Sequence, residues 1–184
     1  MQKKPFTHEQ ILKLRETLKG RDLVLFSLGF DSMLRRSDLL SLRVKDVIDH
    51  CGNPKTRITR IMRKSGSSVT FSVGETARKL LCPYIVSKAL TSEDYLFPGK
   101  YKGKPLSGIQ YSRLVKRWAM LLRLDHSEFS THSMRRTKSA IVYGKTRDIE
   151  VCRQILGHKS VANTSLYLNV SQENALSVVD SLNL

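Results

Sequence analysis

The sequence lacks the features of a membrane span, a disulfide framework or a structural zinc site. No apolar run approaches the roughly 20 residues that cross a bilayer, and the first ten residues, MQKKPFTHEQ, lack the apolar core of a signal peptide. The three cysteines, Cys51, Cys82 and Cys152, are odd in number and have neither CxxC nor metal-ligand spacing. We therefore expect a soluble, cytoplasmic protein with reduced cysteines, no bound metal and no membrane partner.

Acidic residues are also scarce. The 184 residues include 16 Asp and Glu against 32 Lys and Arg, which gives a formal net charge of +16. A positive field of this size suits a polyanion, which composition alone leaves open as DNA, RNA or an anionic membrane. The 40% of hydrophobic residues is enough to bury a core, so the chain is expected to fold. No lysine or arginine follows Lys159, so residues 160–184 are not expected to bind the polyanion.

Helical periodicity accounts for most of the chain. Thr7, followed three residues later by Gln10, is a capping-box signature that opens a helix ending near Gly20. Ser37 is placed to cap a short helix. Further helices are predicted over residues 22–30, 75–89, 107–122, 131–143, 148–156 and 171–184. The last of these has an apolar face, which either folds back on its own domain or docks on a neighbouring protomer.

The pattern changes to β between Leu42 and Val73. Strands are predicted over residues 44–48, 57–62 and 69–73, with a hairpin turn at 65–67 and Lys64 at the end of the middle strand. The chain has the length of one ordinary domain and contains no internal repeat or linker. The sequence therefore predicts one mainly α domain with a small antiparallel three-stranded β-sheet, an α+β fold.

The predicted helix over residues 107–122 has two contrasting faces. One face is an apolar stripe of Tyr111, Leu114, Val115, Trp118, Leu121 and Leu122, and the other holds Gln110, Arg113, Lys116 and Arg117. A solvated helix surface is the plain interpretation of the second face. The charge of the whole chain favours instead a helix that enters a DNA major groove and reads base edges with these four residues.

The stretch from Thr131 to Tyr167 holds the residues with the most chemical potential. His132 and Arg135 are three apart, so on a helix they lie on one face and can converge on one anion. His158 follows a Leu-Gly helix stop, and Tyr167 comes after a short helical run. The Tyr167 hydroxyl could act as a nucleophile beside such an anion.

Cleavage of a phosphodiester by a tyrosine has definite requirements. The phenol, with a pKa near 10 in water, needs a proton acceptor or a strongly positive site. Two arginines can bind the charged non-bridging oxygens of the transition state, and a lysine or histidine can protonate the departing 5′ oxygen. No metal is required if enough fixed cations are present. The chain offers one candidate set: Arg35, Lys64, His132, Arg135, His158 and Tyr167.

The order and local strings of this set resemble the tyrosine recombinases, the phage-integrase family that includes the Xer recombinases, Cre and lambda integrase. LRRSDLLSLRVKDV resembles the first arginine box and contains Arg35, and MRKSGSSV resembles the hairpin with the catalytic lysine, here Lys64. THSMRRT resembles the His-x-x-Arg box, and LGHKSVANTSLYLNV resembles the Leu-Gly-His box that ends in the nucleophile. The resemblance runs from about Thr7 to the C-terminus.

The resemblance implies a role for each residue. Tyr167 would attack the scissile phosphate to form a 3′-phosphotyrosyl bond and a free 5′-hydroxyl, while Arg35 and Arg135 clamp the phosphate. Lys64 would protonate the leaving oxygen. The proton of Tyr167 would be exchanged with His132.

His158 would hydrogen-bond a non-bridging oxygen, according to the same resemblance. The covalent link stores the bond energy, so a second strand can reseal the DNA without ATP, metal or any other cofactor. The implied reaction is site-specific recombination of the integrase or invertase type.

The resemblance also implies partners and a domain arrangement. It implies double-stranded DNA with a specific recombination site, a homotetramer on two duplexes, a nucleoid location, and room for an accessory DNA-bending protein. The element after Tyr167 would be the one exchanged between protomers. Residues 1–184 are expected to form a single catalytic domain without the usual N-terminal core-binding domain, either as a short recombinase like the fimbrial phase-switch invertases or as a catalytic fragment.

Two other functions remain open at this stage. Residues 131–143 and 148–156, separated by Tyr143-Gly144-Lys145, loosely resemble a helix-turn-helix, which a non-enzymatic DNA-binding regulator would use. A type IB topoisomerase would use a similar active site to relax DNA without a partner site. Supercoil relaxation with no sequence preference would indicate the second alternative.

Overall fold

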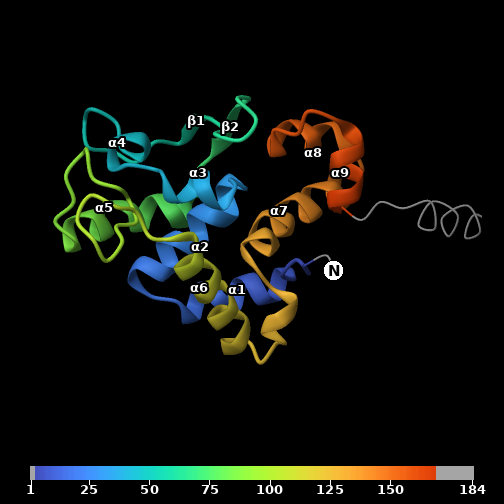
Figure 1. Ribbon diagram of the computed structural model, residues 1–184, viewed down its shortest axis with the longest axis horizontal. Helices are drawn as coiled ribbons and strands as arrows, with labels where there is room; N and C mark the ends of the chain where they lie inside the picture. Colours follow the sequence, from blue (N-terminus) through green and yellow to red (C-terminus); the bar gives the residue numbers. More distant parts are fainter. Residues whose placement is uncertain (1–2, 169–184) are drawn as a thin grey trace, which may run out of the picture.

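The computed structural model describes residues 3–168, and it is mainly helical with one small β-hairpin. Helix α2 (Gly20–Ser32) lies at the centre, with α5 (Glu75–Ser87) and α7 (Thr131–Thr146) packed against it (Figure 1). The other elements are α1 (His8–Thr17), α3 (Arg36–Leu40), α4 (Val44–Val47), β1 (Arg57–Ile61), β2 (Ser68–Ser72), α6 (Gly108–Leu121), the 3₁₀ turn η1 (His126–Glu128), α8 (Ile149–Leu156) and α9 (Val161–Leu168).

Helix α2 is central because it is apolar on nearly every side. Leu25, Phe26 and Leu28 are fully buried, and the Phe26 ring meets Trp118 of α6 edge-on at 5.6 Å between centroids. Gly29 allows the closest approach on this helix, since a Cβ there would lie 3.0 Å from the Tyr111 hydroxyl oxygen. The core therefore forms where α2, α5, α6 and α7 meet, and the site-bearing segments are attached around it.

The capping box predicted at Thr7 is confirmed, but the predicted cap at Ser37 is wrong, because α3 begins at Arg36 with Arg35 as its N-cap and Ser37 lies inside the helix. Thr7 and Gln10 form a reciprocal capping box at α1, and Ser107 and Gln110 form another at α6. The apolar stripe of α6 is buried as predicted through Trp118, but Leu121 is 49% exposed. Leu122, the last residue of the predicted stripe, is partly buried against the core, so Leu121 is the residue that departs from the prediction.

The sheet has two strands in the described part of the chain, so the predicted three-stranded sheet is wrong by one strand. β1 and β2 pair in antiparallel register, with Thr59 opposite Thr70. The predicted strand over residues 44–48 is instead the single turn α4, in which the Asp46 carboxylate accepts a hydrogen bond from the Arg43 backbone at 2.8 Å. Valines at 44 and 47 have helical spacing, and this local cap prevails over their β propensity.

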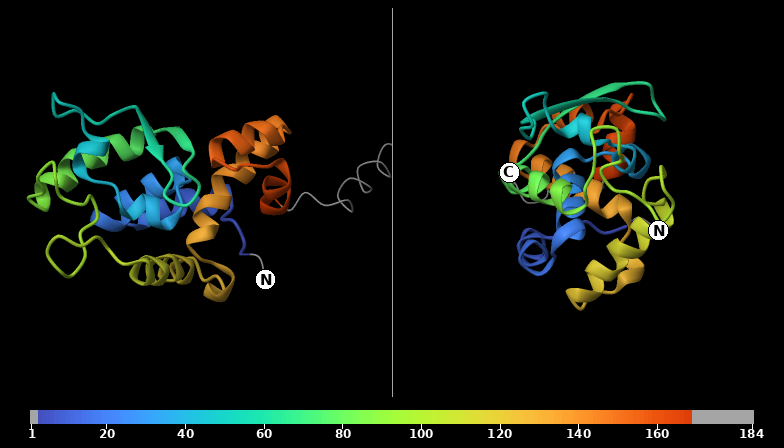
Figure 2. Two further views of the ribbon diagram at one scale, coloured as in Figure 1. Left: turned by 45° about the horizontal axis from the view of Figure 1, so that its top comes forward. Right: turned by 90° about the vertical axis from the view of Figure 1, so that its left-hand side faces the viewer.

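The last three described helices form a unit that contacts the hairpin. Helix α7 is followed by α8 and α9, and α8 lies against β2, as the two further views also show (Figure 2). Gly157 ends α8 in the left-handed conformation, with φ of +62°, and a Cβ at this position would lie 2.4 Å from Val69 Cγ2. A glycine is required here for both reasons.

The predicted helix over residues 171–184, including the proposed exchanged element, lies outside the described residues. Within residues 3–168, no helix is long and apolar enough to cross a membrane.

Candidate active site

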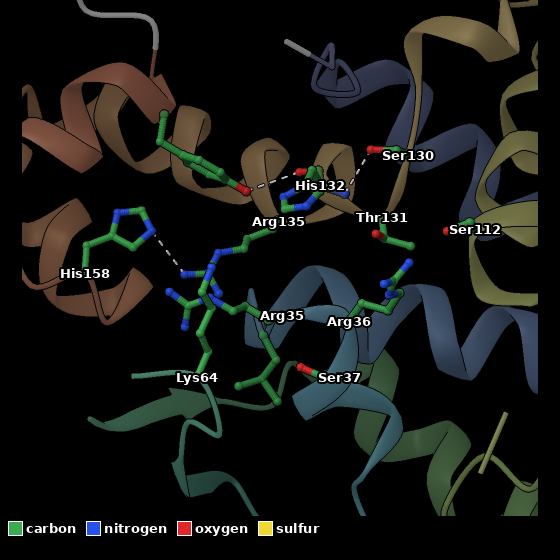
Figure 3. A pocket seen from close by; sticks show the side chains of 12 residues that line it. Arg35, Arg36, Ser37, Lys64, Ser112, Ser130, Thr131, His132, Arg135 and His158 are labelled. Carbon is green, nitrogen blue, oxygen red and sulfur yellow. Dashed lines mark hydrogen bonds between the residues drawn. The ribbon is translucent and has the colours of Figure 1, made fainter. Parts of the chain in front are cut away.

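One cavity of about 460 Å³ brings together all six residues of the predicted set (Figure 3). The six residues come from five segments, because the chain returns to this point from the first helices, the hairpin and the last three described helices. The contributors are Arg35 before α3, Lys64 in the hairpin turn, His132 and Arg135 on α7, His158 after α8 and Tyr167 on α9. Their catalytic roles stay predictions; their convergence is a fact of the fold.

Arg135 is the most constrained of the six. Its side chain is only 3% exposed, and its guanidinium donates to the carbonyl of Met33 at 2.8 Å and to the carbonyl of Leu156. Met33 adopts a left-handed conformation, with φ of +50°, at the end of α2. Burial lowers the pKa of Arg135 to about 10, so the side chain remains charged at neutral pH. Arg135 is thus a fixed cation that joins the ends of α2 and α8.

Arg35 contains a donor that the described residues leave unsatisfied. Its Nη1 is buried and has no hydrogen-bond partner among residues 3–168. An unpaired buried donor costs about 1–3 kcal/mol, which an anion in the cavity would remove. Asp38 is fully buried behind this region and accepts a hydrogen bond from the Arg63 backbone at 3.0 Å, which fixes the hairpin beside α3.

The hydrogen bond between the Arg63 backbone and Asp38 also sets the position of Lys64. This lysine lies on the exposed turn of the hairpin, one residue after Arg63, and its side chain enters the cavity from the side opposite α7 (Figure 3). The hairpin turn closes through Gly66, which has φ of +67° and donates its backbone N–H to Met62 at 2.8 Å. The lysine is therefore held at the rim of the cavity by backbone contacts rather than by its own side chain.

His158 has a defined tautomer in this structure. Its Nε2 lies 3.3 Å from Arg135 Nη2, which can only donate, so Nε2 must be the acceptor. Its Nδ1 lies 3.1 Å from the hydroxyl oxygen of Thr164 and therefore holds the proton. Burial, with the charges of Arg135 and Arg35, lowers the pKa of His158 to about 4. His158 is neutral at pH 7, with its lone pair toward the arginine.

Thr164 is accordingly expected to control the His158 tautomer. Thr164→Val keeps the shape of this fully buried side chain but removes the acceptor, leaving the Nδ1 proton unpaired. We expect a loss of about 1–3 kcal/mol in the free energy of unfolding and a shift of the His158 ring nitrogens toward the other tautomer, measured by ¹⁵N NMR. Thr164→Ser, which keeps the hydroxyl, should retain the original ring-nitrogen shifts. Unchanged shifts in the valine variant would contradict this role.

The depressed pKa of His158 also predicts how stability depends on pH. Because the folded-state pKa lies below the ordinary value of 6.5, the unfolded chain binds more protons between about pH 6.5 and 4. The contribution of His158 is therefore fully present above pH 6.5 and is lost as the pH falls toward 4. Urea unfolding at pH 7.5 and pH 4.5 should show a smaller acid loss for His158→Gln than for the unaltered chain. Equal losses would exclude His158 as a source of the acid sensitivity.

Tyr167 is a protonated phenol in the free protein. Its hydroxyl donates to the main-chain carbonyl of His132 at 3.3 Å, and its ring meets the His158 ring edge-on at 5.4 Å. Burial raises the pKa of Tyr167 to about 12, although the nearby arginine charges act in the opposite direction. As the predicted nucleophile, Tyr167 would therefore need a proton acceptor.

His132 is the predicted acceptor of this proton. It lines the same cavity, and its backbone N–H donates to the Ser130 hydroxyl oxygen at 3.2 Å. Desolvation, together with the charge of Arg135, lowers the pKa of the His132 imidazole, so this ring is also neutral at pH 7. In the free protein the Tyr167 hydroxyl bonds the main chain of His132 rather than its ring.

The four predicted DNA-reading residues do not join this cavity. Gln110, Arg113, Lys116 and Arg117 are exposed on α6, and the Gln110 side-chain oxygen accepts a hydrogen bond from the Ser107 backbone. A base contact by this residue would use its amide nitrogen instead. Their interpretation as DNA-reading residues stays a prediction.

Sequence reasoning missed several residues of the site. Arg36, Ser112, Ser130 and Thr131 also line the cavity, and Thr164 supports it from behind. Only the Arg35-Arg36 pair offered a local signal, because the other positions acquire their neighbours through the fold. Within the described range, no group of three or more His, Cys, Asp or Glu residues is placed to hold a metal ion.

The chain is similar to proteins of known type. The model of the family described as the phage integrase family matches residues 4–174. The chain is 31% identical over 168 residues to "Probable integrase/recombinase YoeC" of Bacillus subtilis, covering 90% of this chain and 88% of that protein. It is 27% identical over 158 residues to "Tyrosine recombinase XerC" of Corynebacterium glutamicum, covering 85% of this chain and 49% of that protein.

Solved structures show the same fold. A crystal structure of the XerH site-specific recombinase, bound to palindromic difH substrate in a post-cleavage complex, superposes with a TM-score of 0.77 at 17% identity. It is matched over 100% of this chain and 54% of that one. A crystal structure of the XerA recombinase gives a TM-score of 0.76 at 20% identity, over 100% of this chain and 65% of that one. The chain thus spans about half the length of several of its relatives and nearly all of another.

Proposed function

Because this chain belongs to the phage integrase family, the tyrosine recombinases, we propose that it cuts and rejoins DNA at specific sites through a covalent bond to Tyr167. The observation that carries the proposal is the single cavity in which all six predicted residues meet. The family alone supports the class of reaction. The convergence supports this chain as one that retains the chemistry.

The proposed cleavage step balances as a transesterification. The Tyr167 oxygen attacks the scissile phosphorus and forms a phosphotyrosyl bond with the 3′ side, while the bond from phosphorus to the 5′ oxygen breaks. The Tyr167 proton passes to His132, and Lys64 gives a proton to the departing 5′ oxygen. Rejoining reverses these transfers when a 5′-hydroxyl attacks the phosphotyrosine, so no bond energy is lost and no ATP is consumed.

Two arginines supply the electrostatic part of catalysis in this proposal. Arg135 is held in place by main-chain carbonyls, and Arg35 has a buried donor that lacks a partner in the described part of the protein. Donors fixed before the substrate arrives stabilise developing negative charge without reorganisation. His158 faces the same region, but its Nε2 now accepts from Arg135. To donate to a phosphate oxygen, His158 would have to gain a proton at Nε2.

The partners follow from the same proposal. The substrate is double-stranded DNA with a recombination site, acted on in the nucleoid by four protomers on two duplexes, with room for an accessory DNA-bending protein. We retain Gln110, Arg113, Lys116 and Arg117 as candidate DNA contacts because they form an exposed basic face. The domain proposal is that residues 1–184 act as a catalytic domain.

Covalent trapping is the direct test of this function. Sites would first be selected from a random 40-bp duplex pool on immobilised protein, and then prepared with a nick beside the cleavage point so that the 5′-hydroxyl fragment diffuses away. We expect a denaturation-resistant protein–DNA adduct that forms equally well with and without EDTA.

The two alternative functions, a DNA-binding regulator and a topoisomerase, predict other results in this experiment. Binding without any adduct would indicate a DNA-binding regulator, although Arg135 of α7 is buried in the cavity rather than free for a groove. Relaxation of supercoiled plasmid without site preference would indicate topoisomerase activity. Either outcome would overturn the recombinase proposal.

A further inference from the structure

A second cavity of about 340 Å³ adjoins the active-site cavity. The two share Arg36 and Ser37 as lining residues, so they are neighbours around the start of α3. The second cavity is also lined by Arg63 and Gly108, and none of its lining residues is acidic. It is therefore a cationic hollow that none of the proposed catalytic steps uses.

Arg36 is the central residue of this hollow. Its side chain is exposed, and it has no hydrogen-bond or ion-pair partner in the part of the chain that the structure describes. Arg21, Arg60 and Arg153, in contrast, each pair with a carboxylate. The Arg36 guanidinium lies so close to α6 that a Cβ on Gly108 would be 2.7 Å from Nε. Gly108 thus provides the space that Arg36 occupies between the two cavities.

The surroundings of Arg36 favour an anion. Arg63 is exposed, and its side chain also has no partner within residues 3–168, so two unpaired cations line one small hollow. The Ser37 hydroxyl is exposed beside them as a further donor. Like charges placed together without a counter-ion repel each other, and a bound phosphate would replace this repulsion with charge-assisted hydrogen bonds.

The position of the hollow identifies which anion it suits. A DNA strand carries one phosphate per roughly 3.4 Å of helix axis, so the neighbours of a bound phosphate lie close by along the strand. Arg35 and Arg36 are consecutive residues, and Arg36 borders both cavities. We propose that the Arg36–Arg63 hollow binds the phosphodiester adjacent to the scissile phosphate on the same strand. This proposal rests on the proposed function, because it places the scissile phosphate at Arg35 and Arg135.

Small nucleotides test the proposal without knowledge of the recombination site. Thymidine 3′,5′-bisphosphate has two phosphates separated by one sugar, as in a DNA strand, whereas thymidine 5′-monophosphate has one. Calorimetric titration of the full chain should give about tenfold tighter binding of the bisphosphate, the size of one charge-assisted contact. In Arg36→Ala this preference should fall to about twofold or less, while the affinity for the monophosphate is unchanged.

Arg57→Ala is the matched control, because Arg57 is an exposed arginine that lines neither cavity, and it should keep the full preference. Equal affinities for the two nucleotides in the unaltered chain would overturn the proposal. An equal loss of preference in both variants would do the same, because it would show a general effect of charge. The proposed function is judged separately by the covalent adduct, so a missing second subsite and a missing recombinase activity are distinguishable.

Discussion

Tyr167→Phe is expected to abolish the covalent protein–DNA adduct completely while leaving DNA affinity within about twofold. The substitution removes one oxygen atom, which is the proposed nucleophile, and keeps the aromatic ring against His158. The substitution removes the 3.3 Å contact to the His132 carbonyl and a side-chain hydrogen bond with Arg135, so the free energy of unfolding should fall by about 1–3 kcal/mol. Denaturing gel electrophoresis of the nicked substrate measures the adduct, and fluorescence anisotropy measures binding.

Tyr101→Phe provides a matched control for this experiment. Tyr101 is 71% exposed and does not line the active-site cavity, so its variant should form the adduct at the normal rate. An adduct that persists in Tyr167→Phe would mean that another side chain is the nucleophile. Loss of both binding and adduct would instead mean that the Tyr167 hydroxyl is needed to hold the site together, and not only to attack the phosphate.

Lys64→Ala is expected to slow cleavage by about 10²–10⁴-fold, the usual contribution of a general acid. The residue is exposed on a turn fixed by backbone contacts, so its truncation should leave the fold and the thermal midpoint nearly unchanged. A duplex in which sulfur replaces the departing 5′ oxygen should restore most of the rate. A thiol has a pKa near 8.5, so its anion leaves without the proton that an alkoxide requires.

The sulfur substrate distinguishes a proton donor from a residue that only binds DNA or stabilises charge. Arg57→Ala, on the same hairpin, should cleave both substrates at the normal rate, because Arg57 does not line the cavity. If Lys64→Ala cleaves the sulfur and oxygen substrates with the same defect, Lys64 acts on binding or transition-state charge and not as the acid. Single-turnover gel assays at saturating protein measure the rates of the unaltered chain and of both variants on the two substrates.

The sequence predicts those parts of the protein that depend on short-range chemistry. The capping box at Thr7 correctly marks the start of α1, and the hairpin turn forms where Gly66 allows it. The strand predicted over residues 44–48 is wrong because a one-turn helix and a short strand have similar apolar patterns. A single carboxylate, Asp46, favours the helix here through the Arg43 backbone.

The residues of the candidate site also fall into those that the sequence predicts and those that only the fold reveals. The six motif residues could be named in advance because each has a distinctive local string. Thr164 could not, because its contact with His158 depends on how α9 folds back after the Gly157 stop. The carbonyl of Met33, which receives Arg135 from 102 positions away, has no side-chain signal at all. Supporting contacts made by the main chain are invisible in a sequence until the fold is known.

The charge arrangement explains why the site can be ready before DNA arrives. Burial, with the charges of Arg135 and Arg35, lowers the pKa of His158, and the pKa of His132 is lowered in the same way, so both rings are neutral at pH 7 and add no further positive charge. The burial that raises the pKa of Tyr167 keeps its hydroxyl protonated and weakly nucleophilic in the free protein. A phosphate would change the balance of charge at all of these groups at once.

The close approach of Gly157 to Val69 couples the hairpin to the last described helix. Lys64 lies on the hairpin with Val69, whereas Tyr167 follows Gly157 on α9. A larger residue at position 157 would push α9 away from the hairpin, and the predicted acid and the predicted nucleophile would then no longer line one cavity.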